Sequence, residues 1–573
     1  MWFLDNPARV KLERSEIDKL YEQVNWLNKA DWKLVDSQLC INADIDVNNY
    51  IYSVQMIYPA LFPLIPPSMK PLDTKRLWSC HQYISGELCL EWGPDNWQEN
   101  ITGADLLRSV YKLLAIDRPL ENEGVVQSAA PSRHALSLGQ EIRNSQLRFL
   151  KQSGVITFLK NQPERVSGFV DCYLVYSRES VTAFIGALQP LDGNKWNNPM
   201  FPKELEKTTF HIKGQFFKLH LTTSAICSLN ISELKNTIKT EGYACPNIGD
   251  DDNQLLLVLD EALELHFFRC RDKDDCYMYQ TLSVPDMDLA SRVGDSLHTL
   301  GNACVGIVGL GSAGSKIAVS LARSGVRDFL LIDSDLFFPE NICRHELTWE
   351  DVGQHKVDGI AHLLQLIDPV IRVNSRKLVL SGQEASSATN SALNALSRCG
   401  IIIDATAEEN VFNLLSNTVF QSKTPYIWLQ IFAGGIGGLL CRFRPEIEPN
   451  PKEMRASLLD CLAQFEQPTL MTQNSYSATD CSGKTIIALD ADVSVIAGHA
   501  TRMAIDLLSR CIPSIFPYSI YLIGFSKGWV FKEPFYTIPI DITGIKSHAS
   551  SIGLPIKDDE DNIKFIKGLL DQN

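Results

Sequence analysis

A glycine-rich turn between two short apolar runs constrains the fold of the C-terminal half of the chain. The run VGIVGL reaches residue 310, and Gly309, Gly311 and Gly314 form the pattern G-x-G-x-x-G. A helical stretch, SKIAVSLARSG, and a second apolar run, FLLIDSD, come next. Strand, glycine loop, helix and strand in this order begin a doubly wound α/β fold. The backbone N–H groups of such a loop can approach phosphates, so the pattern predicts nucleotide binding.

Length and composition limit the other possibilities. A chain of 573 residues is expected to form two to four domains. The net charge of −15 argues against non-specific binding to nucleic acid or an anionic membrane. No run approaches the roughly 20 apolar residues of a membrane span, and a secretory signal is not expected. The 15 scattered cysteines fit a reducing cytoplasm, and no C-x-x-C pair supports a structural zinc site.

Three sections are predicted along the chain. Residues 1–120 combine a helix over 11–28, alternating strand-like stretches and a helix near 102–115, which is typical of an α+β domain. The buried face expected for the first helix contains Leu12, Ile17, Leu20, Tyr21, Val24 and Leu27. Residues 121–290 contain strand-like runs without a motif and are interpreted as an α/β connecting domain. Residues 291–573 form the doubly wound α/β (Rossmann-like) domain.

Charged residues beyond the glycine loop indicate which nucleotide is bound. Asp333 ends the next strand, 19 residues after Gly314, where a carboxylate can bind ribose hydroxyls; a nicotinamide dehydrogenase would share this feature. Attack on the α-phosphorus of a triphosphate needs cations, because charge builds on the departing pyrophosphate. Arg344 and Lys356 can supply them. Asp404 ends a further apolar strand, where a carboxylate can hold Mg²⁺.

These residues resemble the ThiF/MoeB and ubiquitin-activating adenylation family. The resemblance implies ATP and Mg²⁺ as cofactors, with Asp404 beside the metal. The family's second acidic residue on this strand falls at Ala407, with Glu408 and Glu409 just beyond, so the acidic residue that holds Mg²⁺ is left open. The implied nucleotide contacts are Gly309, Gly311, Gly314, Asp333, Asp335, Asn341, Arg344, Lys356 and, reaching from a partner subunit, Arg292.

A cysteine follows the Asp404 strand in the order that activating enzymes use. The segment ATDCSGKTIIALDADVSVIAGHA resembles the thiol region of the autophagy activating enzyme, in which a cysteine and a polar loop precede a long helix. Cys481 matches the nucleophile that attacks the acyl adenylate. A buried cysteine in a turn is the alternative. Cys343, beside Arg344, is interpreted as a small apolar filler.

The N-terminal section resembles a ubiquitin-conjugating enzyme over about 110 residues. The resemblance identifies Cys89 as the transferring thiol. The family's His-Pro-Asn, whose asparagine supports the transition-state oxyanion, is replaced by His81-Gln82-Tyr83, which leaves the oxyanion donor unassigned. The matching motif residues are Tyr58, Pro59, Phe62, Pro63, Pro66, Pro67, His81, Gly86, Cys89, Leu90 and Trp97.

Together the two ends resemble the CD-NTase-associated protein 2 family, the activating–conjugating fusions of bacterial CBASS antiphage operons. The resemblance implies a homodimer that links the C-terminus of a cGAS-like nucleotidyltransferase (CD-NTase) to a target protein amine and so primes antiphage signalling. Three alternatives stay open: a ThiF/MoeB-type adenylyltransferase for sulfur transfer or small-molecule biosynthesis, a nicotinamide-dependent oxidoreductase, and a binding scaffold with a vestigial cysteine.

Overall fold

The computed structural model describes most of the chain and divides it into two compact units, Met1–Asn144 and Ser145–Asn573. The described residues are 1–72, 78, 82–83, 85–117, 138–142, 145–243, 254–270, 276–283, 296–465, 471–474, 477–479 and 485–542.

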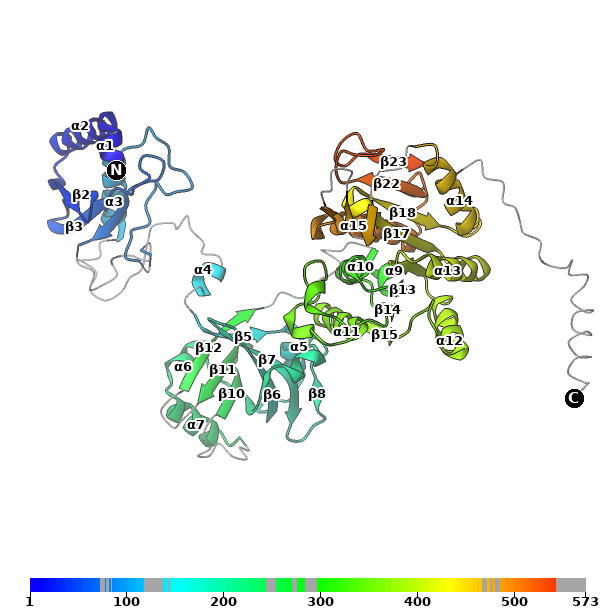
Figure 1. Cartoon of the computed structure of the whole chain (residues 1–573). Coiled ribbons are helices and arrows are strands. Elements are labelled where there is room, and N and C mark those ends of the chain that lie inside the picture. Colours follow the sequence, from blue (N-terminus) through cyan, green and yellow to red (C-terminus); the bar gives the residue numbers. More distant parts are fainter. Residues whose placement is uncertain are drawn as a thin grey trace, which may run out of the picture. The chain divides into compact units, whose positions relative to one another are not determined.

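The first unit is α+β, as predicted (Figure 1). Alternation of apolar and polar residues places Ile41, Ile45 and Val54 in a core that helix α3 covers. Its antiparallel sheet has the order β1-β2-β3-β4. The elements are α1 (Trp2–Asp5), α2 (Pro7–Gln23), β1 (Leu27–Val35), β2 (Gln38–Val47), β3 (Tyr50–Ile57), β4 (Ser68–Pro71), α3 (Gly103–Asp117) and α4 (Leu138–Ile142).

The helix predicted over 11–28 is shifted, and its buried face was predicted only in part: Ile17 and Leu20 are buried as expected. Helix α2 begins and ends earlier, and Leu12 and Tyr21 are exposed. The buried positions include Arg9 and Glu13, whose side chains form an ion pair of 2.9 Å. Burial raises the pKa of Glu13, against the lowering effect of its hydrogen bonds and of Arg9. Paired charges can be buried at positions where hydrophobic periodicity expects a solvent-facing side chain.

The second unit begins with a barrel. Its strands follow the order β5-β12-β11-β10-β9-β6-β7-β8, and a further pairing of β5 with β7 closes the ring. The run QLLLVLDEALELHFF forms two antiparallel strands, β10 and β11. The elements are β5 (Leu147–Lys151), α5 (Ser153–Lys160), β6 (Ser167–Tyr176), β7 (Val181–Pro190), β8 (Trp196–Asn197), η1 (Lys203–Lys207), β9 (Phe210–Lys218), α6 (Thr223–Ser228), α7 (Ile231–Thr240), β10 (Gln254–Leu259), β11 (Leu265–Cys270) and β12 (Cys276–Ser283).

A doubly wound sheet follows, as predicted, with the order β15-β14-β13-β16-β17-β18-β22-β23. Neighbours from β15 to β17 pair in parallel, and β18, β22 and β23 are antiparallel. The strands are β13 (Cys304–Val308), β14 (Asp328–Ile332), β15 (Arg372–Arg376), β16 (Ile401–Asp404), β17 (Tyr426–Phe432), β18 (Gly437–Phe443), β22 (Ile520–Gly524) and β23 (Thr537–Ile540). A small separate sheet contains β19 (Met471–Asn474), β20 (Ser477–Thr479) and β21 (Thr485–Ile487).

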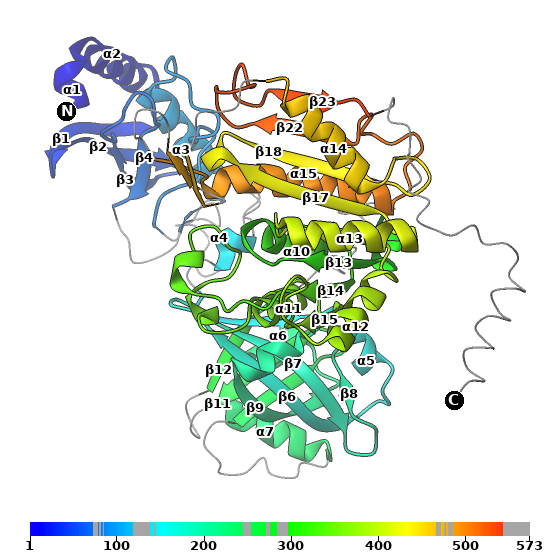
Figure 2. The same cartoon turned by 45° about the vertical axis from the view of Figure 1, so that its right-hand side comes forward.

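Helices cover both faces of the doubly wound sheet (Figure 2). Apolar residues of α10, α11 and α15 pack on one face, and those of α12, α13 and α14 pack on the other. The helices are α9 (Ser296–Gly301), α10 (Ser312–Arg323), η2 (Pro339–Asn341), η3 (Trp349–Asp351), α11 (Lys356–Ile367), α12 (Ser386–Leu396), α13 (Glu409–Ser422), η4 (Ala433–Gly435), α14 (Pro451–Leu462) and α15 (Asp490–Leu508).

The strand order places a ligand crevice beside β13. This strand pairs with β14 on one side and with β16 on the other, so the chain leaves it in one direction and later returns on the opposite side. Open α/β sheets bind ligands at the carboxyl ends of the strands at such a switch point. The glycine loop follows β13 and Asp404 ends β16, so both lie at this edge.

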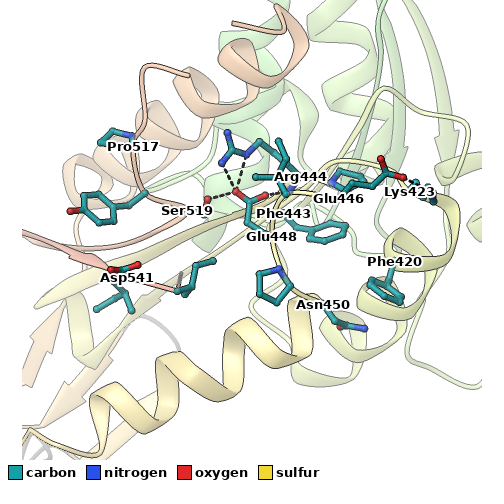
Figure 3. Close-up of a pocket in the computed structure, with 16 residues that line it drawn as sticks. Phe420, Lys423, Phe443, Arg444, Glu446, Glu448, Asn450, Pro517, Ser519 and Asp541 are labelled. Carbon is teal, nitrogen blue, oxygen red and sulfur yellow. Dashed lines mark hydrogen bonds and ion pairs between the residues drawn. The ribbon is translucent and has the colours of Figure 1, made fainter. Parts of the chain in front are cut away.

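A buried polar network joins β18 to the C-terminal end of α15. The Arg442 side chain is fully buried, and its Nη1 lies 3.3 Å from Oδ2 of Asp506. Arg442 Nε donates to Oγ of Ser519, which donates in turn to Glu448. Figure 3 shows the outer part of this network, where Arg444 pairs with Glu448 beside a hollow of about 620 Å³. None of the predicted site residues that the structure describes lines this hollow.

Replacing Asp506 with alanine should destabilise the second unit by about 3 kcal/mol, because a buried guanidinium loses its charge partner. The measurement is urea-induced unfolding of the full chain. Glu446→Ala is the control, because the Lys423–Glu446 pair beside the same hollow is largely exposed; it should unfold at the wild-type urea concentration. Equal unfolding midpoints for the two variants would show that the network does not stabilise the fold.

Candidate active site

The glycine loop has the close backbone contacts that its sequence predicts. Gly309 has a φ of +83°, and a Cβ there would lie 2.8 Å from Cγ2 of Thr406. A Cβ on Gly314 would lie 1.9 Å from the carbonyl oxygen of Gly309, so the loop packs directly against α10. Gly311 is the N-cap of α10, and a Cβ at this position would have no atom within 4 Å. A ligand can therefore approach the backbone at the positive end of the helix dipole.

Two side chains hold Leu310, in the middle of this loop, by both of its backbone polar groups. Leu310 N–H donates to Oδ2 of Asp333 over 2.6 Å, and His345 Nε2 donates to the Leu310 carbonyl over 2.7 Å. Burial lowers the pKa of His345 to about 4, so the ring is neutral at pH 7. Burial raises the pKa of Asp333, against the lowering effect of its two backbone N–H donors. The role of His345 was not predicted; its position next to Arg344 was the only signal.

A pocket of about 180 Å³ lies against the loop. Of the predicted nucleotide residues that the structure describes, Gly309, Gly311, Asp333, Asp335 and Lys356 line it, while Gly314, Asn341, Arg344 and Asp404 do not. The first residue of α11, Lys356, is 8% exposed. Its Nζ lies 2.8 Å from Oδ2 of Asp335. The glycine loop and a nearly buried lysine therefore line one small pocket.

Asp404 lies behind this pocket rather than in its wall. It is 3% exposed, and its carboxylate accepts hydrogen bonds from Thr406 Oγ1 at 2.6 Å and Tyr426 OH at 3.0 Å. Burial raises the pKa of Asp404, which these bonds partly offset. Thr406 Oγ1 also accepts the N–H of Glu408, and the Glu408 residue lines the pocket. After β16, Glu408 rather than Asp404 lines the pocket, and the metal role predicted for Asp404 stays a prediction.

Asn341 and Arg344, which do not line the pocket, contact other parts of the domain. The Asn341 side chain accepts the N–H of Phe338 and so caps η2. Arg344 Nη1 lies 3.4 Å from the carbonyl oxygen of Ala488, two residues before α15. The interpretation of Cys343 as an apolar filler is wrong, because this cysteine is exposed and its thiol donates to the carbonyl of Glu340.

Several predictions fall outside the described residues, namely Cys481, Arg292 and His81. Within the described ranges, no group of three or more histidine, cysteine or acidic side chains could hold a metal ion. None of the helices in the described part of the chain is long and apolar enough to cross a membrane.

The first unit holds Cys89 between two anchored neighbours. Leu88 N–H donates to the Met69 carbonyl of β4, and Glu91 N–H donates to Oγ of Ser109 on α3. Cys89 itself is half-buried. The two acidic residues near it in sequence form ion pairs with lysines, Glu87 with Lys70 and Glu91 with Lys112. The cysteine is therefore fixed in place but accessible.

Comparison with protein families identifies the doubly wound domain. Residues 286–523 match the model of the ThiF family. The chain carries a ThiF-family domain. Residues 169–284, in the barrel, match a model described as a domain observed between E2 and E1 domains. The predicted likeness of the C-terminal section to the ThiF family is thereby confirmed.

Curated relatives of this chain include proteins named as ubiquitin transferase-like and as an adenylyltransferase/sulfurtransferase. The chain is 32% identical over 142 residues to the ATP-dependent ubiquitin transferase-like protein Cap2 of Enterobacter hormaechei, covering 24% of this chain and 23% of that protein. It is 26% identical over 252 residues to Cap2 of Escherichia coli, covering 41% and 40%. The probable adenylyltransferase/sulfurtransferase MoeZ of Mycobacterium tuberculosis is 26% identical over 152 residues, covering 26% and 36%.

These alignments span between about a quarter and two-fifths of the relatives' own length. With the two family models, they confirm the predicted resemblance to the activating–conjugating fusion proteins. A solved structure of Escherichia coli MccB with ATP matches with a TM-score of 0.34 and 17% identity, covering 47% of this chain and 74% of that one. A score this low carries no conclusion about function.

Proposed function

We propose that this protein activates the C-terminus of another protein with ATP and passes it, as a thioester, from Cys481 to Cys89 and on to an amine. The observation that carries the proposal is the pocket formed by the glycine loop, Asp333 and Lys356 in a ThiF-family domain, on a chain that also holds an accessible cysteine in a separate α+β unit.

In the first step a substrate carboxylate attacks the α-phosphorus of ATP, and pyrophosphate leaves. The backbone N–H groups at the start of α10, beside Gly311, hold phosphate oxygens, while Lys356 and Arg344 stabilise the charge of the leaving group. Asp333 positions the ribose with its remaining acceptor capacity. The oxygen ligands that Mg²⁺ prefers are present in Glu408, with Asp404 behind it, and the bound ion would neutralise phosphate charge. Arg292 would add a cation from the partner subunit of a homodimer.

In the second step the Cys481 sulfur attacks the acyl adenylate, a C–S bond forms and AMP leaves. The acyl group then moves to Cys89 by exchange of one thioester for another. Finally, an amine attacks the Cys89 thioester, an amide forms and the thiolate leaves. The fixed but accessible position of Cys89 supports its place as the last carrier.

The substrate and setting are also part of the proposal. Two of the relatives are called ubiquitin transferase-like, which supports a protein substrate. We propose a cGAS-like nucleotidyltransferase as that substrate, a cytoplasmic location, and functional sections at 1–120, 121–290 and 291–573. The name of MoeZ as an adenylyltransferase/sulfurtransferase favours sulfur transfer after adenylation as the second candidate.

The test is mass spectrometry of the intact full chain after incubation with ATP and a nucleotidyltransferase encoded by a neighbouring gene. Our proposal requires ATP-dependent adducts of the nucleotidyltransferase, minus one water, on Cys481 and Cys89, both removed by a reducing thiol. Pyrophosphate exchange without an adduct on either cysteine would reject the relay and favour the sulfur-transfer alternative.

A further inference from the structure

A phenol hydroxyl is directed at the sulfur of Cys89. The Tyr83 OH lies 3.7 Å from Sγ of Cys89, in hydrogen-bonding geometry for a sulfur acceptor. Tyr83 is half-buried, as is the cysteine. Among side chains, Glu87 and Glu91 are also close to Cys89 in sequence, but ionised carboxylates only accept hydrogen bonds. Tyr83 therefore brings a donor to the position where the proposed acyl group is bound.

The backbone holds the two groups in one turn. Tyr83 N–H donates to the carbonyl of Glu87 and Gly86 N–H donates to the carbonyl of Tyr83, both over 2.8 Å. Gly86 has a φ of +85°, which a glycine adopts without strain. Gln82 forms a bridge with Leu88, and its Nε2 donates to the Gly86 carbonyl over 2.9 Å. The hydroxyl and the sulfur thus belong to one hydrogen-bonded loop, which limits their relative movement.

We propose that the Tyr83 hydroxyl donates a hydrogen bond to the oxyanion that forms when the Cys89 thioester is attacked. The motif His81-Gln82-Tyr83 contains no asparagine that could take this role. The inference rests on the proposed function of Cys89. When an amine attacks, its nitrogen bonds to the carbonyl carbon and the carbonyl oxygen becomes negatively charged. The carbonyl then re-forms as the C–S bond breaks, the electron pair leaves on Sγ, and the amine proton passes to solvent.

The position and protonation of Tyr83 fit this role. The carbonyl carbon of the acyl group is bonded to Sγ, so its oxygen develops charge beside a donor that already contacts the sulfur. Such a donor stabilises the transition state because its position is set before the reaction. Burial, and then the hydrogen bond to and charge of Cys89, raise the pKa of Tyr83 to about 12. The phenol therefore keeps its proton at neutral pH and acts as a donor, not as a base.

The test is discharge of Cys89 in the Tyr83→Phe variant of the full chain. Cys89 is first loaded with the nucleotidyltransferase, ATP is removed, and single-turnover loss of the adduct to free lysine is followed by mass spectrometry. We expect discharge to slow roughly 10- to 100-fold, at or below the lower end of the roughly 100- to 1,000-fold that loss of one oxyanion donor costs. Tyr83→Asn, which supplies an amide N–H, should recover part of the rate. Tyr50→Phe, at an exposed tyrosine of the same unit, should discharge at the wild-type rate.

A second readout needs no substrate. Alkylation of Cys89 by iodoacetamide is followed on its own peptide as a function of pH. Losing the hydroxyl donor in Tyr83→Phe should shift the alkylation midpoint to higher pH, because the thiolate loses a hydrogen bond.

The discharge and alkylation measurements distinguish a wrong role for Tyr83 from a wrong proposed function. Discharge of Tyr83→Phe within twofold of wild type would overturn the role of Tyr83 while leaving the relay intact, and so would an unchanged alkylation profile. A wild-type protein that never carries an adduct on Cys89 would overturn the proposed function and, with it, the oxyanion role.

Discussion

Replacing Lys356 with alanine should reduce ATP–pyrophosphate exchange by about 1,000-fold or more, which corresponds to roughly 4 kcal/mol of transition-state stabilisation. Lys356 is 8% exposed and lines the pocket beside the glycine loop. Charge that develops on departing pyrophosphate there is poorly solvated, so a fixed cation has a large effect. The measurement is the exchange of labelled pyrophosphate into ATP by the full chain in the presence of its substrate.

The fold should tolerate this change, because the partner of Lys356, Asp335, is 65% exposed and can be solvated by water. Lys377→Ala is the matched control: Lys377 pairs with Asp358 at the surface and lies outside the pocket wall. It should exchange pyrophosphate at the wild-type rate. Exchange by Lys356→Ala at the wild-type rate, with an unchanged unfolding temperature, would remove this lysine from the adenylation step.

Local sequence patterns predicted the framework of this site. The glycines, Asp333 and Lys356 lie in a continuous stretch of about 50 residues, and their spacing places them at the end of β13, the end of β14 and the start of α11. Each position follows from a short-range rule of strand, turn and helix. The rule works because the parallel strands of a doubly wound sheet bring their carboxyl ends to one edge.

Contacts between segments distant in sequence were not predictable in this way. Asp404 ends its strand as expected, but its partner Tyr426 lies on the next strand and holds it behind the pocket. His345 holds Leu310 across 35 residues. The buried Arg9–Glu13 pair was an unexpected addition to the buried face of α2. It is stabilised by Tyr58 and Gly103, far along the chain, which supply hydrogen bonds to Glu13. The spacing of apolar residues within one segment does not indicate which distant residues will contact it.

Replacing each of the two proposed carrier cysteines should block a different step of the relay. Cys481→Ala should exchange pyrophosphate at the wild-type rate but form neither thioester, because the sulfur that attacks the acyl adenylate is missing. Cys89→Ala should accumulate the Cys481 adduct and form no amide product. The expected loss of product is complete in both variants, since no other step in the proposed relay creates the bond that the missing sulfur makes. The measurement is intact-mass analysis of enzyme and product after a single addition of ATP.

Exposed cysteines provide the controls. Cys343 and Cys227 are both exposed, and Cys343 is next to Arg344, so it is the nearest competitor for the acyl adenylate in sequence. Alanine at either position should leave both thioesters and the product unchanged. Amide product from Cys89→Ala at the wild-type rate would place the final transfer directly on Cys481. It would also leave the first unit without a chemical role, because a sulfur that never carries the acyl group cannot hand it to an amine.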